Sequence, residues 1–155
     1  MNNTLFNYRG LIIILSLLVI IPSCKKDKLG ISQKSLIGHW LEVEPAGIIQ
    51  FGGTNHEFYF NNNGTFALKR DYWTDVVFSD PCQSNHSDYV VGTFAKTNNQ
   101  FSFTGKYSNA QFTVLQPNVC GETDYAFSTT YTYQNGILTL NSGQEPYFQI
   151  ALHKQ

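Results

Sequence analysis

The side chains best suited to chemistry are three cysteines and four histidines in a chain of 155 residues. Cys82 and Cys120 both lie among turn-forming residues, and Asp80, His86 and Asp88 lie close to Cys82 along the chain. Zinc accepts cysteine, histidine and carboxylate ligands, but a structural zinc site uses a second clustered pair, which this segment lacks. Two cysteines in an oxidising compartment pair as a disulfide. We therefore predict a Cys82–Cys120 disulfide in preference to a metal site.

The third cysteine, Cys24, follows an apolar run and indicates the compartment. Residues 11–21 are apolar apart from Ser16, and at about 1.5 Å per helical residue they cover roughly half of a bilayer core. That length is too short for a transmembrane helix and suits the apolar region of a signal peptide. Ile21, Ser23 and Cys24 resemble the lipobox of bacterial lipoproteins, in which a small residue precedes a lipidated cysteine. The alternative is an ordinary secretory signal with an incidental cysteine.

The lipobox resemblance implies a signal peptide over residues 1–23 and a lipidated Cys24 that begins a flexible tether over residues 24–30. Several acyl chains on Cys24, palmitate among them, would hold the protein at a membrane, because each buried methylene contributes about 0.8 kcal/mol. The tether carries three lysines and one aspartate. Related surface-exposed lipoproteins often carry an acidic run there instead. We therefore expect the protein in the bacterial cell envelope, lipid-anchored on the periplasmic face of the outer membrane.

The composition of the mature chain excludes several classes of function. Removal of residues 1–23 leaves 132 of the 155 residues, which suits a single domain, placed here at residues 31–155. From residue 31 onward ten Asp and Glu stand against six Lys and Arg, a formal charge of −4. Such a domain lacks the basic surface that nucleic-acid binding requires. Phosphate-loop, nucleophile-elbow, zinc-protease and Cys-x-x-Cys motifs do not occur. We expect no enzymatic activity, no cofactor, no metal and no nucleic-acid partner.

The pattern along residues 31–155 is one of short strands separated by turns. Residues 31–36 form one helical turn capped by Ser32, and a strand follows at residues 38–44. Asn-Gly pairs, which supply the positive φ of tight turns, join residues 56–60 to 65–73 and residues 124–133 to 137–140. Further strands are predicted at residues 48–51, where Gly52-Gly53 ends the strand, and at residues 75–78, 88–96, 101–107, 111–116 and 147–154. This pattern favours an all-β barrel or sandwich.

Alternation within residues 124–133 places four aromatic side chains on one face, namely Tyr125, Phe127, Tyr131 and Tyr133. Three of the four carry hydroxyl groups, which is more than an aliphatic core would use. Either this stripe lines a cavity, where the hydroxyls meet ligand or water, or it packs against neighbouring strands with its hydroxyls at the rim. In the cavity interpretation these residues bind a small ligand, with Trp73 at the mouth.

Two charged segments lie near Trp73. Lys69-Arg70 stand among many acidic residues, and we interpret both as solvated surface. Asp71 and Asp75 flank an aromatic pair, an arrangement that can serve as a carbohydrate platform or an acid–base pair. We adopt the simpler interpretation, a strand end that enters a solvated loop.

Three further segments resemble lipocalin-like domains of bacterial outer-membrane lipoproteins. Gly38-His39-Trp40 is similar to the Gly-x-Trp signature on their first strand. Residues 58–66 resemble their hairpin with an Asn-Gly turn, and residues 133–154 fit their last two strands. The resemblance implies an antiparallel up-and-down β-barrel of roughly eight to ten strands, with Trp40 packed structurally across one end.

The resemblance also implies two possible functions. Some members of the family bind small apolar molecules, and many bacterial members have no assigned activity. We therefore expect a membrane-anchored, lipocalin-like lipoprotein that binds a small apolar or aromatic ligand in its barrel. The alternative is a structural or interaction module of the envelope, with a filled barrel that binds a protein partner through its disulfide-pinned loops.

Overall fold

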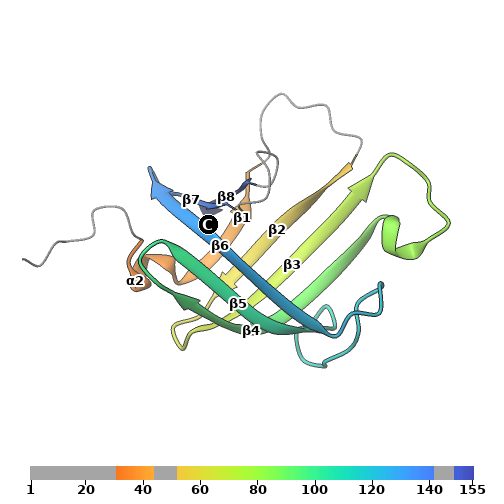
Figure 1. The fold of residues 1–155 in the computed structure, drawn as a ribbon, viewed down its shortest axis with the longest axis horizontal. Coiled ribbons are helices and arrows are strands. Elements are labelled where there is room, and N and C mark those ends of the chain that lie inside the picture. Colours follow the sequence, from red (N-terminus) through yellow and green to blue (C-terminus); the bar gives the residue numbers. More distant parts are fainter. Residues whose placement is uncertain (1–30, 44–51, 142–148) are drawn as a thin grey trace, which may run out of the picture.

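The computed structural model describes residues 31–43, 52–141 and 149–155. These residues form a closed barrel in which each strand pairs antiparallel with the next and the last pairs with the first (Figure 1). The strands are β1 (Gly38–Glu42), β2 (Gly52–Phe60), β3 (Thr65–Thr74), β4 (His86–Lys96), β5 (Gln100–Ser108), β6 (Asp124–Gln134), β7 (Ile137–Asn141) and β8 (Gln149–Lys154). The predicted all-β, up-and-down barrel is confirmed, with eight strands.

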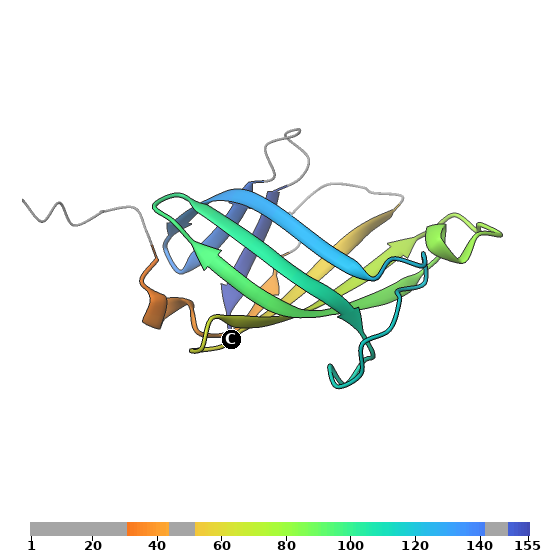
Figure 2. The ribbon, with the colours of Figure 1, turned by 60° about the horizontal axis from the view of Figure 1, so that its bottom comes forward.

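Tight turns gather at one end of the barrel, which we call the hairpin end (Figure 2). The turns at residues 61–64, 97–99 and 135–136 lie there, together with α2 (Gln33–Leu36). The predicted Asn-Gly turns are confirmed, since Gly64 has φ 78° and the residues at 135 and 136 have φ 53° and 81°. In α2 the Ser32 hydroxyl accepts a hydrogen bond from the Ser35 backbone N–H, as the capping prediction requires.

The opposite end, which we call the loop end, carries the longer connections at residues 75–85 and 109–123 (Figure 2). The predicted disulfide between Cys82 and Cys120 is confirmed and joins these two loops, with a Cα–Cα distance of 4.9 Å. Cys82 lies in the short 3-10 helix η1 (Pro81–Gln83), which the Asp80 side chain caps by accepting from the Cys82 N–H.

Three strand predictions near the loop end need correction. Residues 75–78 contain a bend at residues 75–76 and no strand, and residues 111–116 hold only the isolated bridge between Ser108 and Leu115. The Asn109 side chain explains the second error, because its oxygen accepts from the N–H groups of residues 113 and 114 and bends the chain away from the sheet. Gly52 and Gly53 begin β2 and do not end a strand. Residues 48–51 and 147–148, also predicted as strand, lie outside the described residues.

The barrel interior follows the alternation of each strand. On β6 the residues Tyr125, Phe127, Thr129, Tyr131 and Tyr133 all point inward, as predicted. Gly92 and Gly105 are partners in the β4–β5 register, and a Cβ on Gly92 would clash with the Thr104 carbonyl oxygen. Only glycine allows the two backbones to approach this closely.

The hairpin half of the interior is a packed apolar core. Its rings interlock with centroids 5.1–6.5 Å apart, and the buried phenylalanines are Phe58, Phe60, Phe66, Phe94, Phe101 and Phe103. Trp40 is fully buried beside Leu36 and Ile31, and its indole N–H donates to the Leu36 carbonyl at 2.6 Å. Trp40 is thus part of the packed core of the barrel, and the lipocalin-like role that the resemblance assigns to it stays a prediction.

Candidate functional site

The inward face of the barrel changes from apolar to charged between its two ends. Along β3 the inward residues are Phe66, Leu68, Arg70 and Tyr72, in that order from the hairpin end to the loop end. The neighbouring β4 runs the other way, so that its inward Asp88 is the register partner of Arg70. The alternation that builds the core therefore also brings a cation and an anion into the interior at the loop end.

Arg70 and Asp88 form a buried ion pair. The Arg70 Nη2 group donates to Asp88 Oδ2 at 2.8 Å and to the Tyr107 hydroxyl at 2.7 Å. The Asp88 side chain is 2% exposed and the Arg70 side chain 16% exposed. A buried charge of either sign is costly unless it is paired, so each residue depends on the other.

Three tyrosine rings surround the guanidinium. The Arg70 Cζ lies 5.3 Å from the Tyr72 centroid, 5.6 Å from that of Tyr107 and 5.2 Å from that of Tyr125. Each distance is within the range of a cation–π interaction. Burial raises the pKa of Tyr125 to about 12, and burial also raises the pKa values of Tyr72 and Tyr107. All three phenols are therefore neutral over the physiological pH range.

The ion pair does not use its full capacity for hydrogen bonds. Within the described residues, the buried atoms Arg70 Nε and Asp88 Oδ1 have no partner at full hydrogen-bond distance and angle, although the Tyr72 hydroxyl interacts with the Asp88 carboxylate. Leaving a buried donor or acceptor unpaired costs about 1–3 kcal/mol, and more when the group is charged. Native proteins retain few such atoms, so each one calls for a specific explanation, such as a catalytic role or a bound water or ion.

The loop at residues 109–123 supplies further polar contacts. The Asn118 side-chain amide donates to Asp88 Oδ2 at 3.3 Å and to Glu122 Oε2 at 3.1 Å. The Tyr107 hydroxyl donates to the same Glu122 oxygen at 2.9 Å. The Asn118 oxygen accepts from the N–H groups of Cys120 and Glu122, which holds the turn closed. The disulfide at Cys120 therefore pins the segment that contacts the ion pair.

His86 completes the cluster on β4. Its Nδ1 lies 2.7 Å from the Ser84 carbonyl oxygen, so this nitrogen carries the proton and Nε2 is left as an acceptor in the neutral ring. The imidazole stacks on Tyr72 with centroids 4.4 Å apart. We call the whole cluster the arginine site, and its members are Arg70, Tyr72, His86, Asp88, Tyr107, Asn118, Glu122 and Tyr125.

A second inward pair lies at the same end, on β1 and β2. His56 Nδ1 lies 2.8 Å from Glu42 Oε2, and the same oxygen accepts from the His56 backbone N–H. Both side chains are largely buried, at 15% and 13% exposed. The polar character of the interior therefore extends beyond the arginine site to the first two strands.

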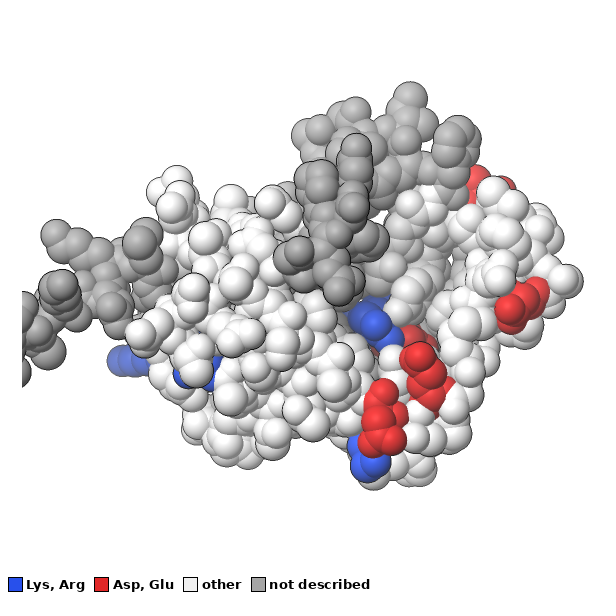
Figure 3. All heavy atoms as spheres, viewed as in Figure 1, with Lys and Arg blue, Asp and Glu red and all other residues white. Residues whose placement is uncertain are grey.

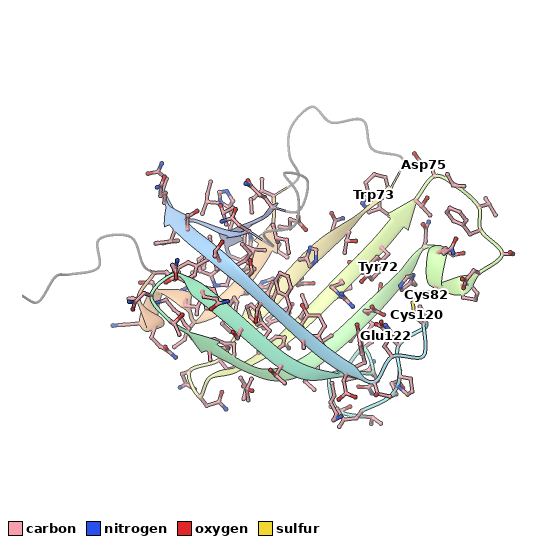
Figure 4. All side chains as sticks on the ribbon, in the orientation of Figure 1. Tyr72, Trp73, Asp75, Cys82, Cys120 and Glu122 are labelled. Carbon is pink, nitrogen blue, oxygen red and sulfur yellow. A yellow bond between two sulfur atoms is a disulfide. The ribbon has the colours of Figure 1, made fainter. Side chains whose placement is uncertain are left out.

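The pictures show how this end of the molecule differs from the rest of the visible surface. In Figure 3 the surface is hollowed at the loop end, where basic atoms lie within the hollow and acidic atoms lie along its lower rim. In Figure 4 Tyr72, Glu122 and the two disulfide cysteines lie near one another at that end. Trp73 and Asp75 lie farther along, where β3 ends.

The five predicted ligand residues do not gather in one place. Tyr125 lies in the arginine site, and Phe127 packs against Phe103 in the middle of the barrel. Tyr131 and Tyr133 lie toward the hairpin end, where they pack on Phe101 and Trp40 respectively. Trp73 is on the opposite face of β3 from the site and is 36% exposed. Phe127, Tyr131 and Tyr133 therefore pack against neighbouring rings, whereas Tyr125 lies beside the charged Arg70.

Arg70 is the main residue that the sequence interpretation missed. The prediction of solvated surface is correct for Lys69, which faces outward and pairs with Asp71 at 2.7 Å. It is wrong for Arg70, because Arg70 shares its strand face with buried Phe66 and Leu68. That alternation is visible in the sequence and is the signal that could have placed Arg70 in the interior.

Comparison with known proteins gives no family for this chain, because no family model, curated protein or solved structure matches it. Among the described residues, no three His, Cys, Asp or Glu side chains converge in a way that could hold a metal ion. No helix within the described ranges is long and apolar enough to span a membrane. The predicted signal peptide, Cys24 and the tether lie outside the described residues.

Proposed function

We propose that this chain is a lipid-anchored binding protein, not an enzyme, and that its barrel takes a small ligand at the loop end. One observation carries the proposal: the buried Arg70 Nε and Asp88 Oδ1 have no partner at full hydrogen-bond distance and angle within the described residues. They lie at the end where the surface is hollowed (Figure 3). Convergent polar groups among aromatic side chains at the mouth of a β-barrel are typical of a ligand site.

The packing of the apolar half favours the loop end over the barrel centre as the ligand position. Phe103 lies in the middle of the interior, and its ring contacts Phe58 across the barrel at 5.5 Å and Phe66 at 5.2 Å. Interlocked aromatic rings of this kind form a close-packed core. The aromatic surroundings of the proposed ligand come from Tyr72 and Tyr125 at the polar end.

The proposed anchor on Cys24 would place the ligand site away from the membrane. Ile31, the first described residue, is buried at the hairpin end beside Leu36 and Trp40. Seven residues of tether span at most about 25 Å. The lipid would therefore be held near the hairpin end. With the lipid in the periplasmic face of the outer membrane, the loop end would point away from the membrane into the periplasm. Replacement of residues 1–24 by an ordinary cleavable secretory signal should move the protein from the membrane fraction to the soluble fraction.

Native mass spectrometry tests the binding function. The chain from residue 25 onward, exported with a cleavable secretory signal, is purified from the periplasm without detergent, and we expect an excess mass that organic solvent removes. The double variant Arg70→Met/Asp88→Leu should lose this excess mass. The matched control is Lys69→Met/Asp71→Leu, which removes the outward ion pair of the same strand and should keep it. An apoprotein mass in the parent chain, or an adduct that persists in the double variant, contradicts the proposal.

A second candidate function, docking of an envelope protein, is favoured by apolar side chains on the two disulfide-joined loops. Val77 is 97% exposed, and its exposed neighbours on these loops are Val76, Phe78, Val114, Leu115 and Val119. Ordered loops bind with a smaller loss of conformational entropy than free ones. A photo-crosslinking residue at position 77 should capture one defined envelope protein in intact cells, and the same residue at Asn63 in the hairpin-end turn should not. Equal capture from both positions would count against docking through these loops.

A further inference from the structure

We propose that the arginine site binds a neutral, polyhydroxylated ligand, a saccharide or a polyol, and not an anion or an amine. This inference rests on the binding function proposed above and adds the chemical class of the ligand. It is carried by two features of the site, the balance of its charges and the mixture of donors and acceptors that the protein leaves unpaired.

The charge balance disfavours a charged ligand of either sign. The positive charge of Arg70 is already paired with Asp88, and Glu122 adds a second carboxylate on the mouth side through Tyr107 and Asn118. A carboxylate or phosphate ligand would therefore approach two anions in a partly buried site, where like charges repel strongly. An ammonium group would meet the guanidinium, which already occupies the faces of the three tyrosine rings. A neutral ligand avoids both penalties.

The unpaired atoms within the site are of both kinds. Arg70 Nε is a donor and Asp88 Oδ1 is an acceptor, and they belong to two side chains whose other atoms are 2.8 Å apart. A hydroxyl group donates one hydrogen bond and accepts two, so a single hydroxyl can satisfy both atoms. A carboxylate only accepts and an ammonium only donates, so each would leave one of the two atoms unpaired.

Three more groups extend this array toward the mouth. Within the described part of the chain, the Tyr125 hydroxyl has no hydrogen-bond partner, and His86 uses only Nδ1 and Glu122 only Oε2. They offer one hydroxyl and two acceptors to a second and a third ligand hydroxyl. Several hydroxyls on one small molecule are the mark of a saccharide or polyol.

The protein holds this array in place before a ligand arrives. Asn118 binds both carboxylates of the site, and its turn is closed by bonds to its own loop. The Cys82–Cys120 bond ties that loop to the one that precedes His86. Groups that are already ordered bind with less loss of entropy, which allows a hydrophilic ligand to compete with water.

The test follows the Nε–H signal of Arg70 in proton–nitrogen NMR spectra. Arg70 and Arg9 are the only arginines of the chain, and Arg9 lies in the predicted signal peptide, so the signal is assigned from its loss in Arg70→Lys. The soluble chain from residue 25 onward, exported with a cleavable secretory signal, is titrated with D-glucose, D-galactose, N-acetyl-D-glucosamine and glycerol. The charged probes are acetate, inorganic phosphate and methylammonium. We expect a saturable shift with at least one neutral probe and none with the charged probes.

Variants and analogues separate ligand binding from a general disturbance of the fold. A deoxy analogue that lacks the hydroxyl proposed to bond both Arg70 Nε and Asp88 Oδ1 should bind at least about 100-fold more weakly, because these buried charged groups are then left unpaired. Asp88→Asn should weaken binding of the neutral probe. Glu122→Gln should weaken it to a lesser degree, and because Glu122 is exposed this change carries no risk to folding. Asp71→Asn on the outer face of β3 should leave binding unchanged.

The outcomes distinguish this inference from the function on which it rests. A saturable shift with acetate, phosphate or methylammonium but no neutral probe overturns the ligand class and leaves the binding function standing. The absence of any shift with neutral probes also overturns it, and an adduct in the native mass spectrum then still supports a ligand of another class. An effect of sugars that is equal in Asp71→Asn, Asp88→Asn and the parent chain marks general solvation and overturns the inference. Saccharide and polyol are separated by whether the sugars or glycerol saturate the signal.

Discussion

The two ends of this barrel use the same eight strands to hold opposite kinds of interior. At the hairpin end, short turns bring the strands together over interlocked phenylalanines and the buried Trp40. At the loop end, the same inward positions of β3 and β4 carry Arg70 and Asp88, with two disulfide-joined loops around them. Burial of apolar side chains stabilises the folded state without requiring exact partners. A buried ion pair with unpaired atoms adds little stability, because the cost of removing its charges from water offsets their attraction. The comparison indicates that the hairpin end supplies most of the stability and that the loop end holds the proposed binding site.

The largest expected effect is in the hairpin half. Phe103→Ala should lower the free energy of unfolding by about 3–5 kcal/mol, because it removes a buried ring and leaves a cavity among its neighbours. The rings around it are Phe58, Phe60, Phe66, Phe94, Phe101 and Phe127. Urea unfolding measures the change. The folded variant should still bind ligand at 25 °C. A folded variant that no longer binds ligand would contradict the assignment of stability to the hairpin end and of binding to the loop end.

The next effect concerns the loop end. Replacement of both cysteines by serine should cost roughly 3–4 kcal/mol in the chain-entropy model, because the bond joins residues 38 apart in the sequence. Hydrogen exchange should then become faster in the loops at residues 75–85 and 109–123, while the β1–β2 and β7–β8 amides near Trp40 keep their protection. Equal loss of protection at both ends would show that the two halves form one cooperative unit.

Single and double replacements of the Arg70–Asp88 ion pair distinguish its effect on ligand binding from its effect on stability. Asp88→Leu alone should destabilise by about 3 kcal/mol, since it leaves the Arg70 charge buried and unpaired, and the partial exposure of Arg70 keeps the loss at the lower end. Arg70→Met/Asp88→Leu should restore stability to within about 1 kcal/mol of the parent chain. The same double variant should bind no ligand. A double variant that is much less stable than either single one would assign the pair a structural role.

The smallest effect is a dependence of stability on alkaline pH. The pKa of Tyr125 rises from 10.0 to about 12 on folding, so between these values the folded state retains a proton that the unfolded state has lost. Stability is therefore full below pH 10 and falls as the pH rises toward 12, by on the order of 2 kcal/mol from this residue. Tyr125→Phe should remove the contribution of this residue and so make the decline in stability between pH 10 and 12, measured by urea unfolding, less steep.

The sequence predicted much of the fold because its signals are local. Asn-Gly pairs require turns, Ser32 caps a helix, and the inward stripe of β6 follows from strict alternation. The spacing of Cys82 and Cys120 among turn residues identified the disulfide. The errors arose where side-chain bonds override strand propensity, as at Asn109, or where Gly52 and Gly53, which were expected to separate two strands, belong to the second one.

The sequence predicts only part of the arginine site. The alternation with Phe66 and Leu68 places Arg70 on the core face of β3, but a charged residue is normally assigned to the surface. Its register partner Asp88 follows from strand pairing that the sequence does not specify. Sites that break a local rule are where function is expected, so the failure of the surface assignment is itself informative.

The amino-acid sequence by itself determined the strand class, the tight turns and the disulfide partners, because each depends on residues close together or on a chemical pairing with few alternatives. Only the tertiary structure decided which side chains meet inside. Arg70 on β3 lies against Tyr125 on β6, and Phe58 on β2 lies against Phe103 on β5. These strands are not neighbours in the sheet. Their side chains meet because the sheet closes on itself, and closure depends on the twist and register of all the strands together.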